Sequence, residues 1–292
     1  MTKYYKFADT IIKITSKESI AIPENMMKFE TPESNYNHSY NICVDDDLDK
    51  IKSWIENKYK INKKIKRENM LILVGENLEV RMPSLYGEEQ PYALTLDNGS
   101  DNTKIWLISR ILHMLSIDTV FGSLLSLEKR VLCNNAFVLH SSYICVNNKA
   151  VLFTAPSGTG KSTQAELWKK YKGAEIVNGD RSLIVKEDEG WFAYGWPICG
   201  SSEICFNKKH KVDAIVILNQ AEENTVVKTG GFSAAKMLIK EITVNMWNIL
   251  FQDKILGLVE KLIEEVDVYE FKCNITKEAV EDLYCVLKNR NK

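Results

Sequence analysis

The stretch Ala150-Val151-Leu152-Phe153-Thr154, followed by Ala155-Pro156-Ser157-Gly158-Thr159-Gly160-Lys161-Ser162, decides how this chain is interpreted. The first five residues are apolar or β-branched, as in a short buried strand. The next eight match the pattern GxxxxGK(S/T), with Ala155 in place of the first glycine. In this pattern the glycines let consecutive amides point at phosphate oxygens, and the helix that follows directs its positive end at the same anion. We therefore predict a phosphate-binding loop (P-loop) between a buried strand and a helix over residues 161–171 that ends at Gly173.

The chemistry expected of this loop is that of a nucleoside triphosphate site. Lys161 is expected to reach the β- and γ-phosphates, and the Ser162 hydroxyl is expected to ligate Mg²⁺. ATP and Mg²⁺ are therefore the expected cofactors. The residues predicted to bind the nucleotide are Ser157, Gly158, Thr159, Gly160, Lys161, Ser162 and Thr163. The alternative is an ordinary glycine-rich turn that binds nothing.

Composition excludes several other classes of protein. Lys plus Arg number 38 and Asp plus Glu number 39 in 292 residues, which disfavours a nucleic-acid binder that acts mainly through charge. No run of about 18 apolar residues occurs, so no membrane span is expected. The seven cysteines form no CxxC pair, and the N-terminus lacks an apolar signal segment. A cytoplasmic protein with reduced thiols is therefore expected.

Residue patterns divide the chain near residue 130. Residues 1–130 predict an N-terminal α+β domain for accessory or substrate-recognition roles, and residues 131–292 predict the α/β domain that holds the P-loop. In the first part we expect a strand over residues 4–15, an amphipathic helix over 47–59 and a basic helix end and loop over 58–67. Hairpins are expected around residues 75–77 and 97–99, and a helix over 107–128, broken near Gly122, is expected to join the two parts.

In the second part, short apolar runs predict strands and longer amphipathic stretches predict helices. Strands are expected over residues 137–145, 150–154, 175–177, 183–185, 191–194, 214–218 and 268–271. Helices are expected over residues 233–247 and 255–263, and from a cap at Thr276 to residue 287.

The order of features around the loop resembles the HPr kinase/phosphorylase family and its relatives in bacterial biosynthetic clusters. That family has a histidine in the strand before the loop, a loop of the form GxSGxGKS and an Asp-Asp-Arg segment soon afterwards. The corresponding features here are His140-Ser141-Ser142, residues 155–162 and Gly179-Asp180-Arg181. Gly195 to Ser202 resembles a substrate-side loop of the kinase-like relatives, and Glu203-Ile204 resembles the start of a later family signature. The resemblance covers roughly residues 135–290 and implies a P-loop kinase domain of the HPr kinase/PEP carboxykinase type.

The resemblance also implies roles for individual residues, each with a structural alternative. Asp180 is the expected base or metal ligand, or else it caps a turn. Arg181 is expected to stabilise the transferring phosphate or to form a salt bridge, and His140 to lie near the γ-phosphate or in the core. Glu203 is the expected second metal carboxylate or an exposed strand residue. The expected acceptor-binding residues, or else an ordinary turn, are Gly200, Ser201 and Ser202.

The sequence departs from the family at two places: Gly179 stands where the family has its other aspartate, and Cys205-Phe206-Asn207 lacks the Arg-Gly of the later signature. The function expected is therefore transfer of the ATP γ-phosphoryl group to a hydroxyl, on a peptide or protein serine or on a small alcohol. The alternative is a nucleotide-regulated module that recruits a peptide or protein partner without transfer. A decarboxylase like PEP carboxykinase ranks last, because further metal ligands are not found. The expected partners are nucleotide and a hydroxyl-bearing substrate, with homo-oligomerisation left open and neither nucleic acid nor membrane.

Overall fold

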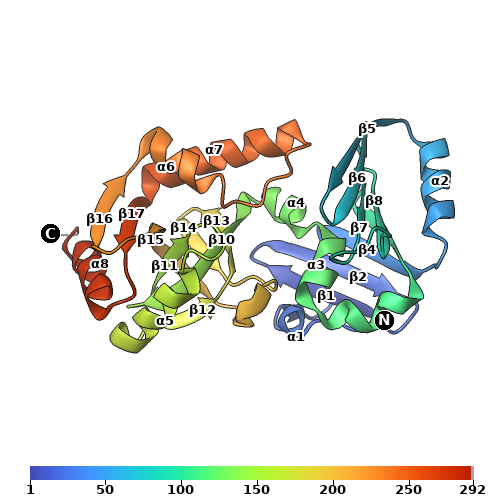
Figure 1. The fold of residues 1–292 in the computed structure, drawn as a ribbon. Helices are drawn as coiled ribbons and strands as arrows, with labels where there is room; N and C mark the ends of the chain where they lie inside the picture. The colour runs from blue at the N-terminus through green and yellow to red at the C-terminus, as the bar shows by residue number, and fades with distance from the viewer. Residues whose placement is uncertain (291–292) are drawn as a thin grey trace. The chain divides into compact units, whose positions relative to one another are not determined.

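The computed structural model describes residues 1–290, and the chain divides into two compact units, Met1–Arg130 and a second that begins at Val131 (Figure 1). Each unit is built on its own β-sheet, so the protein is of mixed α/β class. Among the described residues, no helix is long and apolar enough to cross a membrane.

Within the described residues, the first unit contains a nine-stranded sheet in the order β3-β1-β2-β4-β9-β8-β7-β6-β5. Its strands are β1 (Thr2–Phe7), β2 (Thr10–Ser16), β3 (Glu30–Thr31), β4 (His38–Val44), β5 (Ile61–Arg67), β6 (Met70–Gly75), β7 (Leu78–Pro83), β8 (Ala93–Asp97) and β9 (Asn102–Leu107). Its helices are α1 (Glu24–Met27), α2 (Leu48–Lys58), the 3₁₀ helix η1 (Ser109–Ser116) and α3 (Asp118–Leu125), while α4 (Leu127–Leu132) crosses the boundary between the units. The predicted hairpins β6–β7 and β8–β9 are confirmed.

Two strand predictions in this unit are wrong. The single strand over residues 4–15 is two antiparallel strands, because Ala8 takes a positive φ of 51° and turns the chain. The basic stretch predicted as a helix end and loop forms β5, which pairs antiparallel with β6. Local charge disfavours a strand, but β5 is the last strand of its sheet, and an edge strand tolerates lysines because they project into solvent.

The helices of the first unit follow the sequence pattern where the pattern is regular. The amphipathic helix predicted over residues 47–59 is α2, whose first turn is capped by the Asp47 side chain accepting from the Lys50 amide at 3.0 Å. The helix predicted over residues 107–128 is instead η1, α3 and the beginning of α4. The chain breaks at Ile117, which is extended, and at Ser126, whose φ is 48°, while Gly122 lies inside α3.

Within the described residues, an eight-stranded sheet forms the second unit. Its strands are β10 (Ala136–Val146), β11 (Lys149–Thr154), β12 (Glu175–Asn178), β13 (Arg181–Glu187), β14 (Gly190–Tyr194), β15 (Lys209–Gln220), β16 (Thr225–Thr229) and β17 (Asp267–Cys273). Its helices are α5 (Lys161–Lys172), the 3₁₀ turn η2 (Gly200–Ser202), α6 (Gly231–Leu238), α7 (Ile249–Glu265) and α8 (Lys277–Asn289). Strands β11, β15 and β17 are mutually parallel, and the other pairings are antiparallel.

Helices cover both faces of this sheet. This arrangement explains why the sequence of β11 is apolar throughout. Ala150 and Leu152 pack into a core shared with α6 and α7, while Val151 and Phe153 pack into a second core shared with α5 and α8. Figure 1 shows these two helix pairs on opposite sides of the sheet. A strand buried on both faces has no solvent side to alternate with, so its sequence is a continuous apolar run.

Most elements predicted for the second unit are present, with three differences. The helix predicted over residues 233–247 ends at Leu238, because Ile242 forms a β-bridge with Leu139 and draws the following segment onto β10. Strand β16 was not predicted. Thr276 occupies the cap position of α8, but its side chain does not cap the helix, since its hydroxyl donates to Asn274 Oδ1 at 2.8 Å.

The first unit contains a buried ionic cluster centred on Asp97. Its Oδ2 accepts from Lys129 Nζ at 2.6 Å and from Arg130 Nη2 at 2.7 Å. Burial by itself would raise the pKa of Asp97, but the positive charges of Arg130 and Lys129 outweigh it and hold the pKa well below its usual range. The two cations lie on α4 and the carboxylate ends β8, so the cluster ties the helix to the sheet.

We predict that Asp97→Asn lowers the free energy of unfolding at neutral pH by about 3 kcal/mol, because Lys129 and Arg130 would lose a buried partner. A carboxyl whose pKa is lowered by folding stabilises the fold above its unfolded pKa, and this stability is lost as pH falls through the folded pKa. The wild type should therefore lose more stability than the variant below about pH 4. Urea unfolding, followed by circular dichroism at neutral pH and below about pH 4, measures the free energy of unfolding of both proteins. Glu30→Gln, which removes an exposed pair with Lys3, should cost less than about 1 kcal/mol; equal effects of the two substitutions would contradict the prediction.

Candidate functional site

The predicted P-loop joins the end of β11 to the beginning of α5. Gly158 and Gly160 have φ values of +80° and +107°, a region that favours glycine. A Cβ placed on either would meet no atom within 4 Å, so the backbone conformation, not lack of space, requires glycine there. Ala155 is fully buried and is not among the residues with positive φ. Its substitution for the first glycine of the motif therefore introduces no backbone strain.

The N-terminus of α5 suits an anion. Gly160 is its N-cap residue and has no side chain to accept a hydrogen bond from the first turn. The first amides of a helix need acceptors from outside the helix, and the helix dipole favours a negative one. The open space beside Gly158 and Gly160 leaves room for that acceptor. A phosphate chain therefore fits the loop.

Lys161 folds back over the loop. Its Nζ donates to Ala155 O at 2.9 Å and to Pro156 O at 3.4 Å, and the residue is 7% exposed. Burial lowers the pKa of this ammonium, while the negative charges of Asp180 and Glu241 oppose that shift. Lys161 therefore lies within electrostatic reach of two carboxylates, and phosphate oxygens would compete with the loop carbonyls for its protons.

Two glutamines that the sequence analysis did not identify hold the loop at the sheet edge. Gln220, the last residue of β15, donates to Thr159 O at 3.3 Å. Gln164 on α5 donates to Asn274 O, just beyond β17, at 2.9 Å. The carboxyl ends of the parallel strands β11, β15 and β17 thus meet at the loop, and this is the edge where open α/β sheets bind ligands.

A turn centred on Asn178 presents Asp180. Asn178 is fully buried; its Oδ1 accepts from the amides of Asp180 at 3.1 Å and Arg181 at 3.0 Å, and its Nδ2 donates to Trp196 O at 2.7 Å. The capping residue of this turn is therefore Asn178, so the alternative in which Asp180 caps it does not hold. The carboxylate of Asp180 is left to face other side chains.

The His140-Ser141-Ser142 segment of β10 fastens the turn and the loop to the same strand. Ser142 Oγ donates to Gly179 O at 2.8 Å, and Ser141 Oγ donates to Ser182 Oγ at 2.9 Å. The Thr154 hydroxyl, at the end of β11, donates to His140 O at 2.9 Å. Ser141 and Ser142 are fully buried, so their hydroxyls stabilise the packing of β10 against the turn rather than contact solvent.

The side chain of His140 lies between two carboxylates. Its Nε2 is 3.3 Å from Asp180 Oδ1, and its Nδ1 is 3.2 Å from Glu241 Oε2. Arg181 Nε is 3.3 Å from Asp180 Oδ2. Burial by itself would raise the pKa of Asp180, but the hydrogen bond from His140 and the charge of Arg181 outweigh it and lower the pKa. Asp180 is therefore ionised at neutral pH. Both ring nitrogens can donate to these carboxylates at once only as an imidazolium.

Glu241 is the member of this group that sequence reasoning missed. It was placed within a predicted helix, whereas it lies in the segment that pairs with β10: the His140 amide donates to Glu241 O at 2.8 Å, and the Thr243 amide donates to Val138 O at 3.0 Å. Its side chain is 11% exposed. The signal available in the sequence was weak, because one glutamate among several charged residues on an amphipathic stretch looks like a solvent-facing residue.

The predicted acceptor loop lies against Asp180. A Cβ on Gly200, whose φ is +55°, would be 3.1 Å from Asp180 Oδ2, and a Cβ on Gly179 would be 2.3 Å from Ser202 Oγ. A second aspartate at position 179 would therefore clash with this loop. The side chain of Ser201 lies outside the described part of the structure. Ser202 Oγ donates to Cys199 O at 2.6 Å, so it helps to shape the turn.

Glu203 is exposed and, within residues 1–290, makes no hydrogen bond or ion pair. The described residues also contain no group of three or more His, Cys, Asp or Glu side chains arranged to hold a metal ion. A magnesium ion in a phosphate site commonly needs only one or two protein ligands besides phosphate and water. Ser162, at the start of α5, and Asp180 have the chemistry for that limited role.

Comparison with known proteins places the chain in a family. No curated protein matches it. Among solved structures it is similar to the HPr(Ser) kinase/phosphatase from Coxiella burnetii, at 11% identity and a TM-score of 0.30, over 53% of this chain and 94% of the other. Those values are too low to indicate a shared activity. The family model described as SynChlorMet cassette protein ScmC matches residues 109–279, which is more than half of the chain. This protein therefore belongs to the ScmC family of SynChlorMet cassette proteins.

Proposed function

We propose that the protein is an ATP-dependent kinase that transfers the γ-phosphoryl group to a hydroxyl acceptor. The acceptor is a serine of a peptide or protein, or a small alcohol. The observation that carries the proposal is the geometry of the loop: Gly158 and Gly160 take positive φ values, α5 begins at the loop, and Lys161 Nζ folds back onto Ala155 O.

The proposed reaction is an in-line displacement. The acceptor oxygen forms a bond to the γ-phosphorus as the bond from that phosphorus to the β–γ bridging oxygen breaks, and ADP leaves. The proton of the hydroxyl passes to the carboxylate of Asp180. A carboxylate with a lowered pKa is a weak base, yet phosphoryl transfer proceeds through a loose transition state and depends mainly on positioning and charge.

In this proposal, several positively charged groups neutralise the negative charge of the phosphates. Lys161 leaves the loop carbonyls for the β- and γ-phosphate oxygens, and the α5 amides contact the same chain. Arg181, beside Asp180, stabilises the transferring group. Mg²⁺, held by the Ser162 hydroxyl and by water, would neutralise the phosphate oxygens.

His140 and Glu241 act as positioning residues. The imidazole holds one oxygen of Asp180 at 3.3 Å, and Glu241 holds the other side of the ring at 3.2 Å. A carboxylate held in a fixed orientation is what a general base requires.

Lys161→Met tests the P-loop. It keeps the aliphatic stem and removes the charge, so we expect phosphoryl transfer to fall by about a hundredfold or more. Nucleotide affinity should fall as well. The measurements are transfer from γ-labelled ATP to serine peptides and small alcohols, and calorimetry with Mg-ATP. Lys169→Met, on the exposed side of α5, is the matched control and should retain both. Transfer by Lys161→Met at the wild-type rate would overturn the proposal.

Asp180→Asn separates a kinase from the alternative function, a nucleotide-regulated binding module. The alternative is considered because Gly179-Asp180 carries one carboxylate where the HPr kinase family has two. For a kinase, transfer falls by about a hundredfold or more while Mg-ATP affinity changes little, because the lost group acts on the acceptor. The exposed Asp253→Asn on α7 is the control. Tight Mg-ATP binding by the wild type with no transfer to any acceptor would favour the binding module.

Glu241→Gln tests the positioning role. We expect kcat for transfer to fall by about tenfold with little change in the affinity for Mg-ATP, because His140 loses the carboxylate that orients it. Its pH–rate profile should also shift relative to that of the wild type. Glu264→Gln on α7 is the matched control. A loss of affinity and rate together, or no loss at all, would show that Glu241 only supports the fold.

A further inference from the structure

Strand β5 is the last strand on one side of the sheet in the first unit, so one of its edges has no strand partner. It pairs antiparallel with β6 through the two-residue turn Glu68-Asn69, and Arg67 lies opposite Met70. Residues that flank a two-residue turn form a hydrogen-bonded pair, and the pairs then alternate along an antiparallel ladder. The backbone amides and carbonyls of Lys64 and Lys66 therefore point to the free edge. Such groups are a template for another extended chain.

The charge on this edge has one sign. Residues 58–67 contain six basic residues and no acidic one. Successive side chains of a strand alternate between its faces, so Lys64 and Lys66 project to one face, and Lys63 and Arg67 to the other. Lys64 is paired with Glu56 of α2 at 2.6 Å, whereas Lys63 and Lys66 form no ion pair within residues 1–290. A chain added to this edge would meet positive charge on both of its faces.

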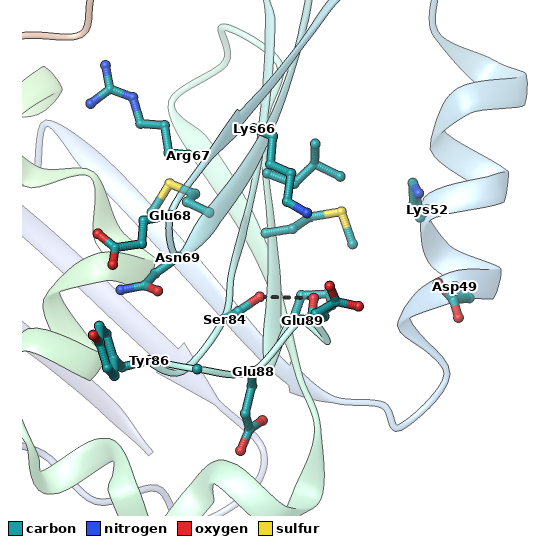
Figure 2. A pocket seen from close by; sticks show the side chains of 15 residues that line it. Asp49, Lys52, Lys66, Arg67, Glu68, Asn69, Ser84, Tyr86, Glu88 and Glu89 are labelled. Carbon is teal, nitrogen blue, oxygen red and sulfur yellow. Dashed lines mark hydrogen bonds between the residues drawn. The ribbon is translucent and has the colours of Figure 1, made fainter.

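A cavity of about 590 Å³ lies at the end of this edge, between the β5–β6 turn, α2 and residues 84–91. Figure 2 shows Lys66 projecting from β5 over the cavity, with Asp49 and Lys52 across from it on α2. Met70, Leu71 and Met82 supply apolar surface. The volume is within the range of ligand pockets, and the lining combines an apolar surface with a few charged groups.

We propose that β5 binds an acidic, extended peptide segment of a partner protein as an additional strand, and that an apolar side chain of this peptide occupies the cavity. Main-chain hydrogen bonds to the free edge would provide affinity, and the lysines and the cavity would provide selectivity, as in other complexes formed by strand addition. The proposal does not rest on the kinase function, since all of its residues lie in the first unit.

Two simpler explanations account for only part of these observations. Lysines on an edge strand hinder pairing between sheets, but that role needs no cavity beside the strand. A basic strand also attracts nucleic acid, but Asp49, Glu68, Glu88 and Glu89 line the cavity and would repel a phosphate backbone. An acidic peptide with an apolar anchor fits both the edge and the cavity, because its backbone lies along the lysines and its apolar side chain avoids the cavity's carboxylates.

The experiment measures fluorescence anisotropy of a labelled peptide, Leu-Glu-Val-Glu-Glu-Val-Glu, with the full chain. The peptide is expected to bind the wild type, and Lys63→Glu combined with Lys66→Glu should weaken binding by about tenfold or more. The same peptide with an N-methyl group on every backbone amide, which has no N–H left to donate to the edge of β5, should not bind. A peptide with lysine in place of each glutamate should not bind either. Glycine in place of the leucine removes the side chain that occupies the cavity and should therefore weaken binding.

A matched control variant reverses the charge of two exposed lysines on α7, by Lys254→Glu combined with Lys261→Glu. This variant should bind the acidic peptide as tightly as the wild type does. Circular dichroism of both double variants checks that they fold. Equal affinity of the wild type and the β5 variant for the acidic peptide, or unchanged binding of the N-methylated peptide, would overturn the proposal. Binding of a single-stranded oligothymidylate with no binding of the acidic peptide would assign the edge to nucleic acid instead.

Discussion

The parallel pairing of β11 with β15, and of β15 with β17, is the constraint on which the second unit depends. Thr154 lies opposite Ile217, and Gln220 lies opposite Cys273, so three strands end at one edge of the sheet. A parallel arrangement requires helices on the faces of the sheet, and here α5 and α8 cover one face while α6 and α7 cover the other. The chain leaving β11 must therefore turn at that edge before α5 can pack, and that turn is the predicted P-loop.

The charged side chains beside the loop are assembled by one long strand. β10 pairs with β13 through its first half and with β11 through its second half, and Leu139 forms a bridge with Ile242. His140 lies where these pairings meet. It is consequently within hydrogen-bond distance of Asp180, from the turn before β13, and of Glu241, from the segment after α6. Positions more than a hundred residues apart are joined because backbone hydrogen bonds align them first.

Elements with strong local signals were predictable. The helix after the loop begins at Lys161 and is ended by Gly173 with φ +65°, as predicted, and Asn147-Asn148 turns between β10 and β11 with both φ values positive. Strand β5 was not predictable from its own residues, because its partner β6 and its position at the sheet edge decide its conformation. The break at Ser126 and the early end of α6 were missed for the same reason: apolar residues at helical spacing fit a helix, yet the contacts of the fold select another path.

The sequence by itself determined the glycine-rich turn between a strand and a helix, because glycine spacing, a buried strand and a following helix are local properties of adjacent residues. It also indicated which side chains around the loop have the chemistry of a phosphate site. Only the tertiary structure decided that His140 lies between Asp180 and Glu241, and that Gly179 has no room for a side chain beside Ser202. Such relations depend on strand pairing and loop packing between distant segments, and spacing along the chain carries no information about distances across a sheet.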